Sequence, residues 1–382
     1  MANNNNTKNL NVPNLRFPEF KGEWRYSSLG RECDILCGYP FDGQAILEKS
    51  GNVKLLRGIN ITEGEIRHSD ELDRYYSGDI LKLKKYILCE GDLVLSMDGS
   101  KVGRNSAILT NLEDGAYLVQ RICRIRSQKH DVKYIFQHIN NSRFHQYVDS
   151  VKTASAIPHI SQSDIQNYII PFPPTHEEQI KITNLLSLLD EHIATQSKII
   201  EDLKKLKSSL LDLLFQNDSK WSTYCISDVL TIGNGRDYKH LKEGNIPVYG
   251  TGGYMLSVND YLYEGESVCI GRKGTIDMPM FLTGKFWTVD TLFYTYNFRN
   301  ILPRFCYYLF TTINWSRYNE ASGVPSLSKT TIEKIKVSVP SLNEQERICS
   351  ILDSVNIKIN IEISILAKFK AQKSYLLRQM FI

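Results

Sequence analysis

The chain has 382 residues, of which 42% are hydrophobic and 23% charged, so it is long enough for two domains and too apolar for wholesale disorder. Lys and Arg exceed Asp and Glu by 46 to 42, a balance that permits nucleic-acid binding without demanding it. The opening MANNNNTKNLN does not resemble a secretory signal, no run of 18 apolar residues predicts a membrane span, and the eight cysteines form no CxxC pair. We therefore expect a cytoplasmic protein with reduced thiols.

Residues 1–174 are predicted to form the first globular domain. Its interior, residues 38–150, contains the glycine-rich strings LLRGINITEG and SMDGSKVGRN, and then LVQRI. Glycine lets a backbone approach a phosphate closely, while Arg, Asn and Gln can pair with guanine or adenine edges. The candidate DNA contacts are Arg57, Asn60, Ser100, Lys101, Arg104, Gln120 and Arg121, with Lys152, Ser155 and His159 in the loop that precedes the last strand. Each alone is a weak signal, because such an Arg is more often a solvated charge or a phosphate contact.

Residues 175–217 are predicted to form a long helix. Thr175 follows a proline and precedes two glutamates, a pattern typical of a helix N-terminus. Apolar residues then recur with the alternating spacing of three and four that marks a coiled-coil seam, at Ile182, Leu186, Leu189, Ile193, Ile200, Leu203, Leu210 and Leu214. The repeated segment within it, about 38 residues, spans roughly 57 Å as a helix, which is too long to bury its seam inside one small domain.

Residues 218–340 are predicted to form the second globular domain. Its opening around Trp221 resembles the segment around Trp24, and the stretch from Glu320 resembles the stretch from Thr153. The interior, residues 234–318, differs from the first but again carries glycine-rich strings, GNGRDYKH, IPVYGTGGYM and CIGRKGTI. The candidates here are Arg236, Tyr238, Lys239, Tyr249, Thr251, Tyr254, Arg272, Lys273 and Thr275, with Ser322 and Ser326 in the loop before the last strand. A plain hairpin that selects glycine for its turn explains GRKG equally well.

Residues 341–382 are predicted to form a second long helix that repeats the first. The segment 343–381 aligns without a gap on 177–215 at an offset of 166 residues. The second seam is Ile348, Leu352, Val355, Ile359, Leu366, Phe369, Leu376 and Met380. Repeated frames around divergent interiors indicate one scaffold built twice, with each copy tuned to a different ligand. Chance similarity explains three anchors in the same order poorly.

One polar residue interrupts each seam near its middle, Gln196 in the first helix and Glu362 in the second. If the helices pack antiparallel about a pseudo-twofold axis, these midpoints meet, so we expect a polar pair that fixes the register. Two side chains that simply face solvent are the alternative. Antiparallel packing also predicts two domains roughly 40 to 55 Å apart, which corresponds to roughly 12 to 16 base pairs of DNA. The target should then be split into two halves.

Catalytic motifs are scarce in this sequence. It has no GxxxxGK[ST] string for ATP and no Asn/Asp-Pro-Pro-aromatic string of an adenine methyltransferase. Asp92, Asp98 and Lys101 could be arranged as a nuclease centre, but Asp92 also fits an ordinary turn before a strand. We therefore expect a non-catalytic protein. A fused methyltransferase or nuclease without recognisable motifs, and a coiled-coil adaptor that never meets DNA, remain the alternatives.

The assembled features resemble the specificity subunits of type I restriction-modification systems. The similarity lies in the opening VPNLRFPEFKGEW, the repeated proline and EQ-helix element, the VYGTGGY and GRKG strings, and the order domain, helix, domain, helix. The resemblance covers essentially the whole chain, and the repeated EQ-helix arrangement is its specific part.

The resemblance implies an α+β protein in which two α/β target recognition domains are separated by two long antiparallel coiled-coil helices with a pseudo-twofold repeat. In that family each domain reads one half of a bipartite double-stranded DNA target, and the helices dock two modification subunits. S-adenosylmethionine, ATP and Mg are then expected in the modification and restriction partners, and no cofactor, metal or catalytic residue in this chain. No DNA-contact residue is carried over from the family, so the candidates rest on loop chemistry alone.

Overall fold

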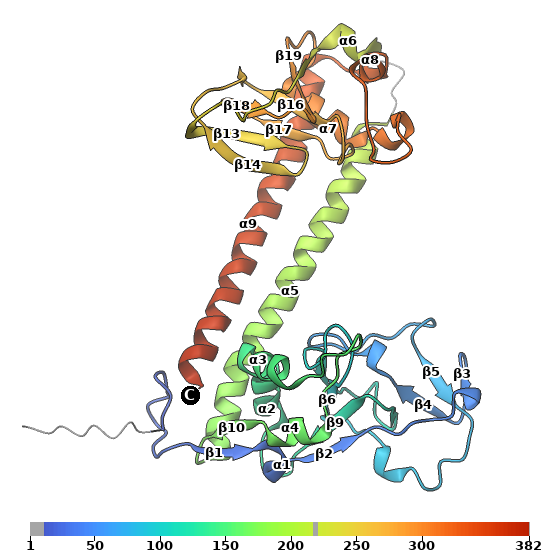
Figure 1. Cartoon of the computed structure of the whole chain (residues 1–382), viewed down its shortest axis with the longest axis vertical. Helices are drawn as coiled ribbons and strands as arrows, with labels where there is room; N and C mark the ends of the chain where they lie inside the picture. Colours follow the sequence, from blue (N-terminus) through green and yellow to red (C-terminus); the bar gives the residue numbers. More distant parts are fainter. Residues whose placement is uncertain (1–10, 217–220, 382) are drawn as a thin grey trace, which may run out of the picture. The chain divides into compact units, whose positions relative to one another are not determined.

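The computed structural model describes residues 11–216 and 221–381, which form two compact units. Unit 1 comprises residues 1–195 and 367–382, and unit 2 comprises residues 196–366. The division falls inside the two long helices, so each unit holds one globular domain and a part of each helix (Figure 1). The predicted ends of the domains at 1–10, 217–220 and 382 lie outside the described residues.

The globular part of unit 1 is built from short strands and helices. In chain order they are β1 (Arg25–Ser28), α1 (Leu29–Glu32), β2 (Asp34–Cys37), η1 (Gly43–Ala45), β3 (Ile46–Leu47), β4 (Val53–Leu56), η2 (Gly58–Asn60), β5 (Arg74–Tyr76), η3 (Lys84–Tyr86), β6 (Leu93–Ser96), β7 (Ser106–Ile108), β8 (Tyr117–Leu118), β9 (Ile122–Arg126), α2 (Val132–Ile139), α3 (Ser142–Val151), α4 (Gln162–Asn167) and β10 (Ile169–Phe172). The sheets have the orders β2-β9-β6-β7, β3-β5-β4-β8 and β1-β10. Only β4 and β8 pair in parallel among the named strands of these sheets.

The globular part of unit 2 repeats this plan. Its elements are β11 (Ser222–Cys225), α6 (Ile226–Val229), β12 (Thr231–Asn234), β13 (Glu243–Gly250), β14 (Gly253–Val258), β15 (Tyr263–Glu264), β16 (Ser267–Gly271), β17 (Met280–Leu282), β18 (Lys285–Thr288), β19 (Leu292–Tyr296), α7 (Pro303–Thr312), η4 (Trp315–Tyr318), α8 (Lys329–Glu333) and β20 (Lys336–Val339). The orders β12-β19-β16-β17 and β11-β20 match β2-β9-β6-β7 and β1-β10, and β13 pairs β18 in parallel as β4 pairs β8. The internal repeat predicted from the anchors therefore extends through the divergent interiors.

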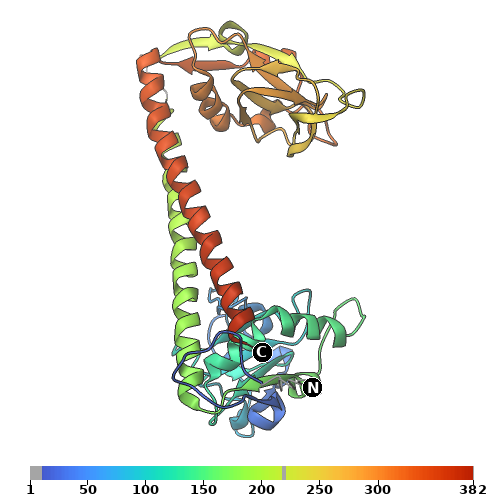
Figure 2. The ribbon, with the colours of Figure 1, turned by 90° about the vertical axis from the view of Figure 1, so that its left-hand side faces the viewer.

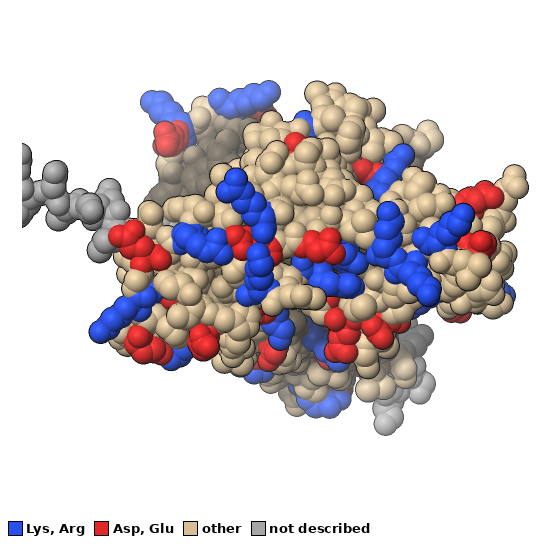
Figure 3. Space-filling view, turned by 90° about the horizontal axis from the view of Figure 1, so that it is seen from below, with Lys and Arg blue, Asp and Glu red and all other residues tan. Residues whose placement is uncertain are grey.

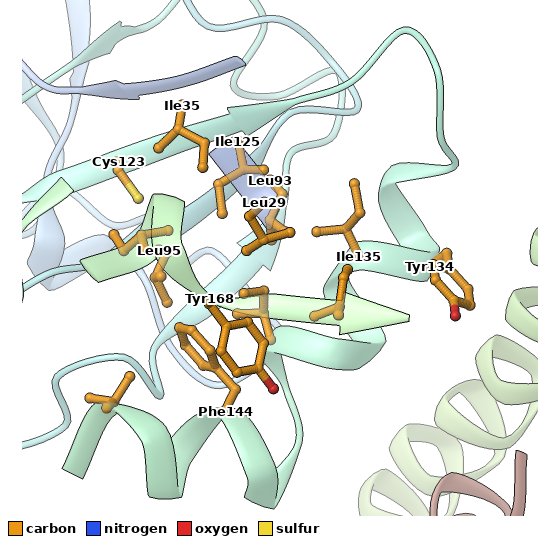
Figure 4. Close-up of a cluster of buried hydrophobic side chains, with 14 of the residues drawn as sticks. Leu29, Ile35, Leu93, Leu95, Cys123, Ile125, Tyr134, Ile135, Phe144 and Tyr168 are labelled. Atoms are coloured by element: carbon orange, nitrogen blue, oxygen red, sulfur yellow. The ribbon is translucent and has the colours of Figure 1, made fainter. Parts of the chain in front are cut away.

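The main core of unit 1 lies between the sheet of β2, β9 and β6 and the helices that cover it (Figure 4). Alternate residues of the strands face it, among them Leu93, Leu95, Cys123 and Ile125, each fully buried. Helix α2 is capped by Asp131, whose side chain accepts a hydrogen bond from the backbone N–H of Lys133. The helix contributes buried apolar residues to the same core. A side chain at the start of a helix that accepts such a bond satisfies a donor that the helix cannot.

Helices α5 (His176–Leu214) and α9 (Leu342–Met380) are each 39 residues long. The hydroxyls of Thr175 and Ser341 accept hydrogen bonds from the backbone N–H of Glu178 and Glu344 at 3.3 and 3.4 Å, so the predicted start signals act as caps. The predicted seam residues of both helices are buried or half-buried. None of the helices in the described parts is both long enough and apolar enough to span a membrane.

The helices pack antiparallel within each unit. In unit 1, Asp190 pairs with Lys373 at 2.5 Å, and His192 stacks on Phe369 with ring centroids 5.4 Å apart, so the partner number on α9 falls as the number on α5 rises (Figure 2). In unit 2, Gln196 contacts Glu362. The α5 end also packs into the core beside Leu352 there. The predicted antiparallel pairing is confirmed within both units.

The repeated Glu-Gln pair joins each helix to its own domain. Gln179 accepts a hydrogen bond from the backbone N–H of Asp131 at 3.2 Å, and Gln345 accepts one from the backbone N–H of Leu302 at 2.8 Å. Both glutamines are buried. Each Gln side chain thus accepts from the backbone N–H of the residue just before a packed helix, α2 in unit 1 and α7 in unit 2. This shared role explains why both copies have Gln at this place.

Candidate nucleic-acid interface

Three segments that are separate in the sequence of unit 1 meet where β6 ends and β9 begins, in the middle of the β2-β9-β6-β7 sheet. They are the turn after β6, the residues before β9 and the loop before α4. Backbone hydrogen bonds join Met97 N to Arg121 O at 2.8 Å, Gly99 N to Pro158 O at 3.0 Å and Ile160 N to Met97 O at 2.9 Å. The backbone therefore fixes how these three segments present their side chains.

Two adjoining hollows open at this junction. The Ile157 hollow has a volume of about 550 Å³ and is lined by Cys37, Met97, Asp98, Gln120, Arg121, Ile157, His159, Ile160 and Ser161. The Arg57 hollow has a volume of about 430 Å³ and is lined by Arg57, Gly58, Ile59, Ser96, Asp98, Gly99, Ser100, Lys101, Asn105, Val119, Gln120 and Arg121. Asp98, Gln120 and Arg121 line both hollows. Predicted candidates from four stretches of the sequence are thus brought together: Arg57, then Ser100 and Lys101, then Gln120 and Arg121, then His159.

Arg121 occupies the centre of this surface. Its φ of +69° is uncommon for a residue other than glycine, and its guanidinium donates to the carboxylate of Asp98 at 2.9 Å while 64% of the Arg121 side chain remains exposed. The ion pair leaves other guanidinium N–H groups available to a ligand. A strained backbone at an exposed, polar position is more typical of function than of stability.

Arg57 adds a positive charge at the rim of the same surface. Partial burial lowers its pKa from the usual value, and the nearby Arg74 lowers it further. Among the described residues it has no carboxylate partner. A half-buried guanidinium without a counter-ion favours an incoming anion such as a phosphate.

Unit 2 repeats the same backbone junction. Arg272 N bonds to Thr291 O at 2.7 Å, Gly274 N bonds to Pro325 O at 2.8 Å and Leu327 N bonds to Arg272 O at 2.8 Å. Met97 therefore corresponds to Arg272, and Pro158 corresponds to Pro325. The frame of three backbone contacts is the same in the two units.

The side chains on this shared frame differ. The matching backbone bonds show that Thr291 takes the place of Arg121. The bridge between Lys273 and Ser326 matches the bridge between Asp98 and His159, so Lys273 takes the place of Asp98 and Ser326 that of His159. The Val324 hollow has a volume of about 890 Å³ and is lined by Asn234, Arg272, Lys273, Asp290, Thr291, Phe293, Glu320, Ala321, Val324, Ser326, Leu327, Ser328 and Lys329. One scaffold thus carries two different sets of hydrogen-bond donors and acceptors.

The chain belongs to the type I restriction-modification DNA specificity family. The family model, described as "Type I restriction modification DNA specificity domain", matches residues 21–205 and again residues 218–371. Two matches in one chain agree with the repeated architecture.

Individual relatives of this specificity family are distant. The EcoBI specificity subunit of Escherichia coli is 24% identical over 215 residues, which are 55% of this chain and 43% of that protein. The MjaVIII specificity subunit of Methanocaldococcus jannaschii is 23% identical over 337 residues, which are 73% of this chain and 75% of that protein. The chain therefore spans less than half of the length of the first of these relatives.

A crystal structure of a type I restriction-modification S subunit from M. genitalium has the same fold. It superposes with a TM-score of 0.67 at 18% identity and covers 97% of this chain and 99% of that chain. At this identity the likeness shows a shared fold only. The candidate interface of this specificity-family member is therefore inferred from its own residues.

The hairpin of β13 and β14 borders the Val324 hollow. A Cβ added to Gly274 would lie 3.5 Å from the Thr251 hydroxyl, so the predicted GTGG and GRKG strings are neighbours. Tyr249 and Tyr254 contact edge to face at 6.3 Å, and Tyr254 is 62% exposed. A further hollow of about 730 Å³ along this hairpin is lined by Tyr254 together with the predicted Tyr238 and Lys239.

Asn60 does not fit its predicted role. Its side chain is fully buried. Its amide accepts from the backbone N–H of Arg57 at 3.2 Å and donates to Arg67 O at 3.0 Å and to Asp73 at 3.2 Å. The amide is therefore consumed in holding the loop after β4, and Asn60 cannot contact a base in this structure.

The remaining predicted residues are not among those that line the hollows. Arg104 and Lys152 both pair with Asp149 on α3, at 2.6 and 2.7 Å. Exposed or half-exposed side chains that do not line the Ile157 or Val324 hollow are Ser155, Arg236, Thr275 and Ser322. Their contact with DNA stays a prediction.

The acidic residues of the rival nuclease arrangement are committed to ion pairs. Asp92 is 2% exposed, and its carboxylate accepts two hydrogen bonds from Arg126 at 2.5 and 2.7 Å. Asp98 pairs with Arg121. Within residues 11–216 and 221–381, no group of three His, Cys, Asp or Glu side chains is placed to hold a metal ion.

Several residues of the interface were missed by the sequence reasoning. The sequence suggests Asp98 only as part of a nuclease centre, and it predicts no site role for Asp290, Thr291, Ile157 or Val324. For Ile157 and Val324 the available signal was their place one residue before the proline that both copies share. On the face seen in Figure 3, basic and acidic side chains are interspersed, so charge alone does not mark a single binding surface there.

Proposed function

We propose that this chain is the DNA-reading subunit of a type I restriction-modification complex, and that each globular domain contacts one half of a split target. The observation that carries the proposal is the junction of three segments, which has the same backbone bonds in both units and different side chains. A conserved frame with exchanged donors and acceptors suits two readers of different sequences.

In unit 1 the pair of Arg121 and Asp98 presents a guanidinium fork beside a carboxylate. Arg can bond to guanine O6 and N7, and a carboxylate can accept from cytosine N4. In unit 2 the corresponding places hold Thr291 and Lys273, so the second reader has a hydroxyl and an ammonium instead. Arg57 and Arg272 are suited to the phosphates that position the duplex.

The chain supplies recognition and no chemistry in this proposal. The pairing of Asp92 with Arg126 supports it, because a carboxylate held by two charge-assisted hydrogen bonds is a poor metal ligand. S-adenosylmethionine for adenine methylation, and ATP and Mg for restriction, would be bound by the partner subunits. Binding of S-adenosylmethionine by the purified chain alone would favour the rival enzyme.

The two modification subunits would dock on the helices. Besides their buried seams, α5 and α9 expose apolar side chains that the chain itself does not cover, among them Leu188, Leu206, Leu213, Ile357 and Ile361. Exposed apolar residues on a long helix are typical of a surface that binds another protein. We place the complex in the cytoplasm, where it would meet chromosomal DNA.

Mapping of methylated adenines across the genome of the host, with and without the gene for this chain, tests the proposal. One split motif should lose methylation. A filter-binding titration of the purified protein should also give a steep negative dependence of log K on log salt. An unchanged methylation pattern, together with the absence of any salt-dependent DNA binding, would leave the adaptor as the better description.

A further inference from the structure

In both domains an exposed branched apolar side chain stands directly before the shared proline. Ile157 is 58% exposed and precedes Pro158, and Val324 is 56% exposed and precedes Pro325. Each lines the hollow of its own unit, Ile157 beside Arg121 and Val324 beside Arg272 and Lys273. A single exposed apolar residue needs no explanation. The same kind of residue at the same place in two otherwise divergent readers does need one.

The loops that carry Ile157 and Val324 are held at their base. Thr153 N bonds to His159 O and Glu320 N bonds to Ser326 O, both at 3.0 Å. The carbonyl of the proline is held in turn by the glycine of the adjoining turn, as described above. A proline fixes its own φ and restricts the residue before it to extended backbone. The apolar side chain is therefore presented by a fixed loop.

The surroundings of these side chains select their partner. Cationic residues beside them attract phosphates, and within a duplex the apolar surface that lies next to phosphates is the base stack or a thymine methyl group. A thymine methyl is offered by one base only, whereas Asp98 and Lys273, at corresponding places beside these side chains, carry opposite charges and favour different bases. A contact kept in both readers should be to something that every sequence offers.

We propose that Ile157 and Val324 are wedges, each of which enters the base stack of one half of the target and unstacks a base step there. Proteins that kink DNA use Ile, Leu, Phe and Met in this way. The inference rests on the proposed function and deepens it. Once a base step is unstacked, less free energy is needed to extrude the neighbouring base for methylation.

Duplexes of the mapped target that carry 2-aminopurine at successive single positions provide the test. The fluorescence of this base rises when it unstacks. The full-length protein, alone and in the complex in which it is purified from its host, should raise the fluorescence at one step in each half of the target. Ile157→Ala should abolish the rise in one half and Val324→Ala the rise in the other, so each variant is the internal control of the other.

Matched variants separate a wedge from a general defect. Ile157→Val keeps a branched side chain and should keep the rise. Leu81→Ala removes a side chain that is 77% exposed and lines none of the four hollows, so it should also keep the rise. If the wild-type protein binds with a steep salt dependence but no position brightens, the wedge is wrong and the proposed function stands. Replacement of thymine by uracil that weakens binding as much as Ile157→Ala does would also overturn it. If no DNA binds at all, the proposed function fails and the wedge fails with it.

Discussion

The buried amide of Gln196 donates hydrogen bonds to both the carboxylate and the backbone carbonyl of Glu362, the residue 166 positions further along the chain. The offset of this pair is the offset of the repeat itself, so two equivalent residues of the two helices contact each other. Lys358 also pairs with the Glu362 carboxylate. Because this polar contact lies among apolar seam positions, we expect it to favour one register of the helices in unit 2.

Substitution Gln196→Glu should lower the thermal unfolding temperature of the protein, because it sets two carboxylates against each other in a buried place. Glu362→Gln should be tolerated better, since two amides can still bond. The double exchange, Gln196→Glu with Glu362→Gln, should recover part of the loss, and differential scanning calorimetry measures all three. Equal melting temperatures for Gln196→Glu and the double exchange would contradict a register role.

Two glycines at corresponding places should resist substitution. A Cβ on Gly38 would lie 1.9 Å from the carbonyl oxygen of Val119, and one on Gly235 would lie 1.9 Å from that of Val289. Gly38→Ala and Gly235→Ala should each destabilise the protein, on the order of 1 to 3 kcal/mol, because a backbone carbonyl must move. Gly43→Ala, which meets nothing within 4 Å, is the control in urea unfolding and should change the midpoint little.

Asn60→Ala should reduce stability without changing the electrostatics of DNA binding. It removes an amide that satisfies backbone groups of Arg57 and Arg67, and a buried group left without its partner costs about 1 to 3 kcal/mol. The exposed Asn52, which makes one hydrogen bond to Ser77 O, provides the matched variant and should cost less. The salt slope of DNA binding should equal that of the wild type, and a shallower slope would restore Asn60 as a phosphate or base contact.

Arg121→Gln should relax the sequence requirement in one half of the target only. It removes a fork that can bond to a guanine, a loss of about 1 to 3 kcal/mol at the position concerned. Thr291→Ala should act on the other half, because Thr291 holds the corresponding place in unit 2. Methylome sequencing of hosts that carry each variant shows which positions become degenerate. Degeneracy in both halves from either substitution would contradict the division between two readers.

His138 should make unit 1 sensitive to acid. Full burial lowers its pKa to about 3, and the charge of Arg143 adds to the effect. Its ring packs on Phe381 with centroids 4.3 Å apart, and its Nε2 has no hydrogen-bond partner among the described residues. An unfolded histidine takes up a proton below about pH 6.5, so the free energy of unfolding should fall as pH drops from about 6.5 toward 3.

The variant His138→Gln tests this linkage. The dependence of the unfolding free energy on pH between about 6.5 and 4 should become shallower by close to one proton, since the group that titrates on unfolding is gone. Urea unfolding over that range measures the slope, and values at pH 8 give the packing cost of the substitution by itself. An unchanged slope would mean that His138 is already charged in the folded protein.

The helices and their repeat could be predicted from the sequence because both depend on local periodicity. The residues of a buried stripe on a helix recur every three or four positions, and this spacing predicts the seam, as at Ile182 and Leu186 or Ile348 and Leu352. The polar residue that interrupts each seam predicts the contact of Gln196 with Glu362. The gapless alignment of the two helices at an offset of 166 residues also predicts the pseudo-twofold symmetry. These features need no knowledge of distant contacts.

The interface was decided by the tertiary structure alone. Asp98, Arg121 and Pro158 come together because β9 lies between β2 and β6, an order that no local pattern encodes. Asn60 illustrates the same limit of sequence-based prediction. A polar residue in a glycine-rich loop is expected to be exposed, but the folded loop buries Asn60. The sequence determines which side chains are present. Hydrogen bonds between strands that are distant in the sequence determine which of those side chains face a ligand.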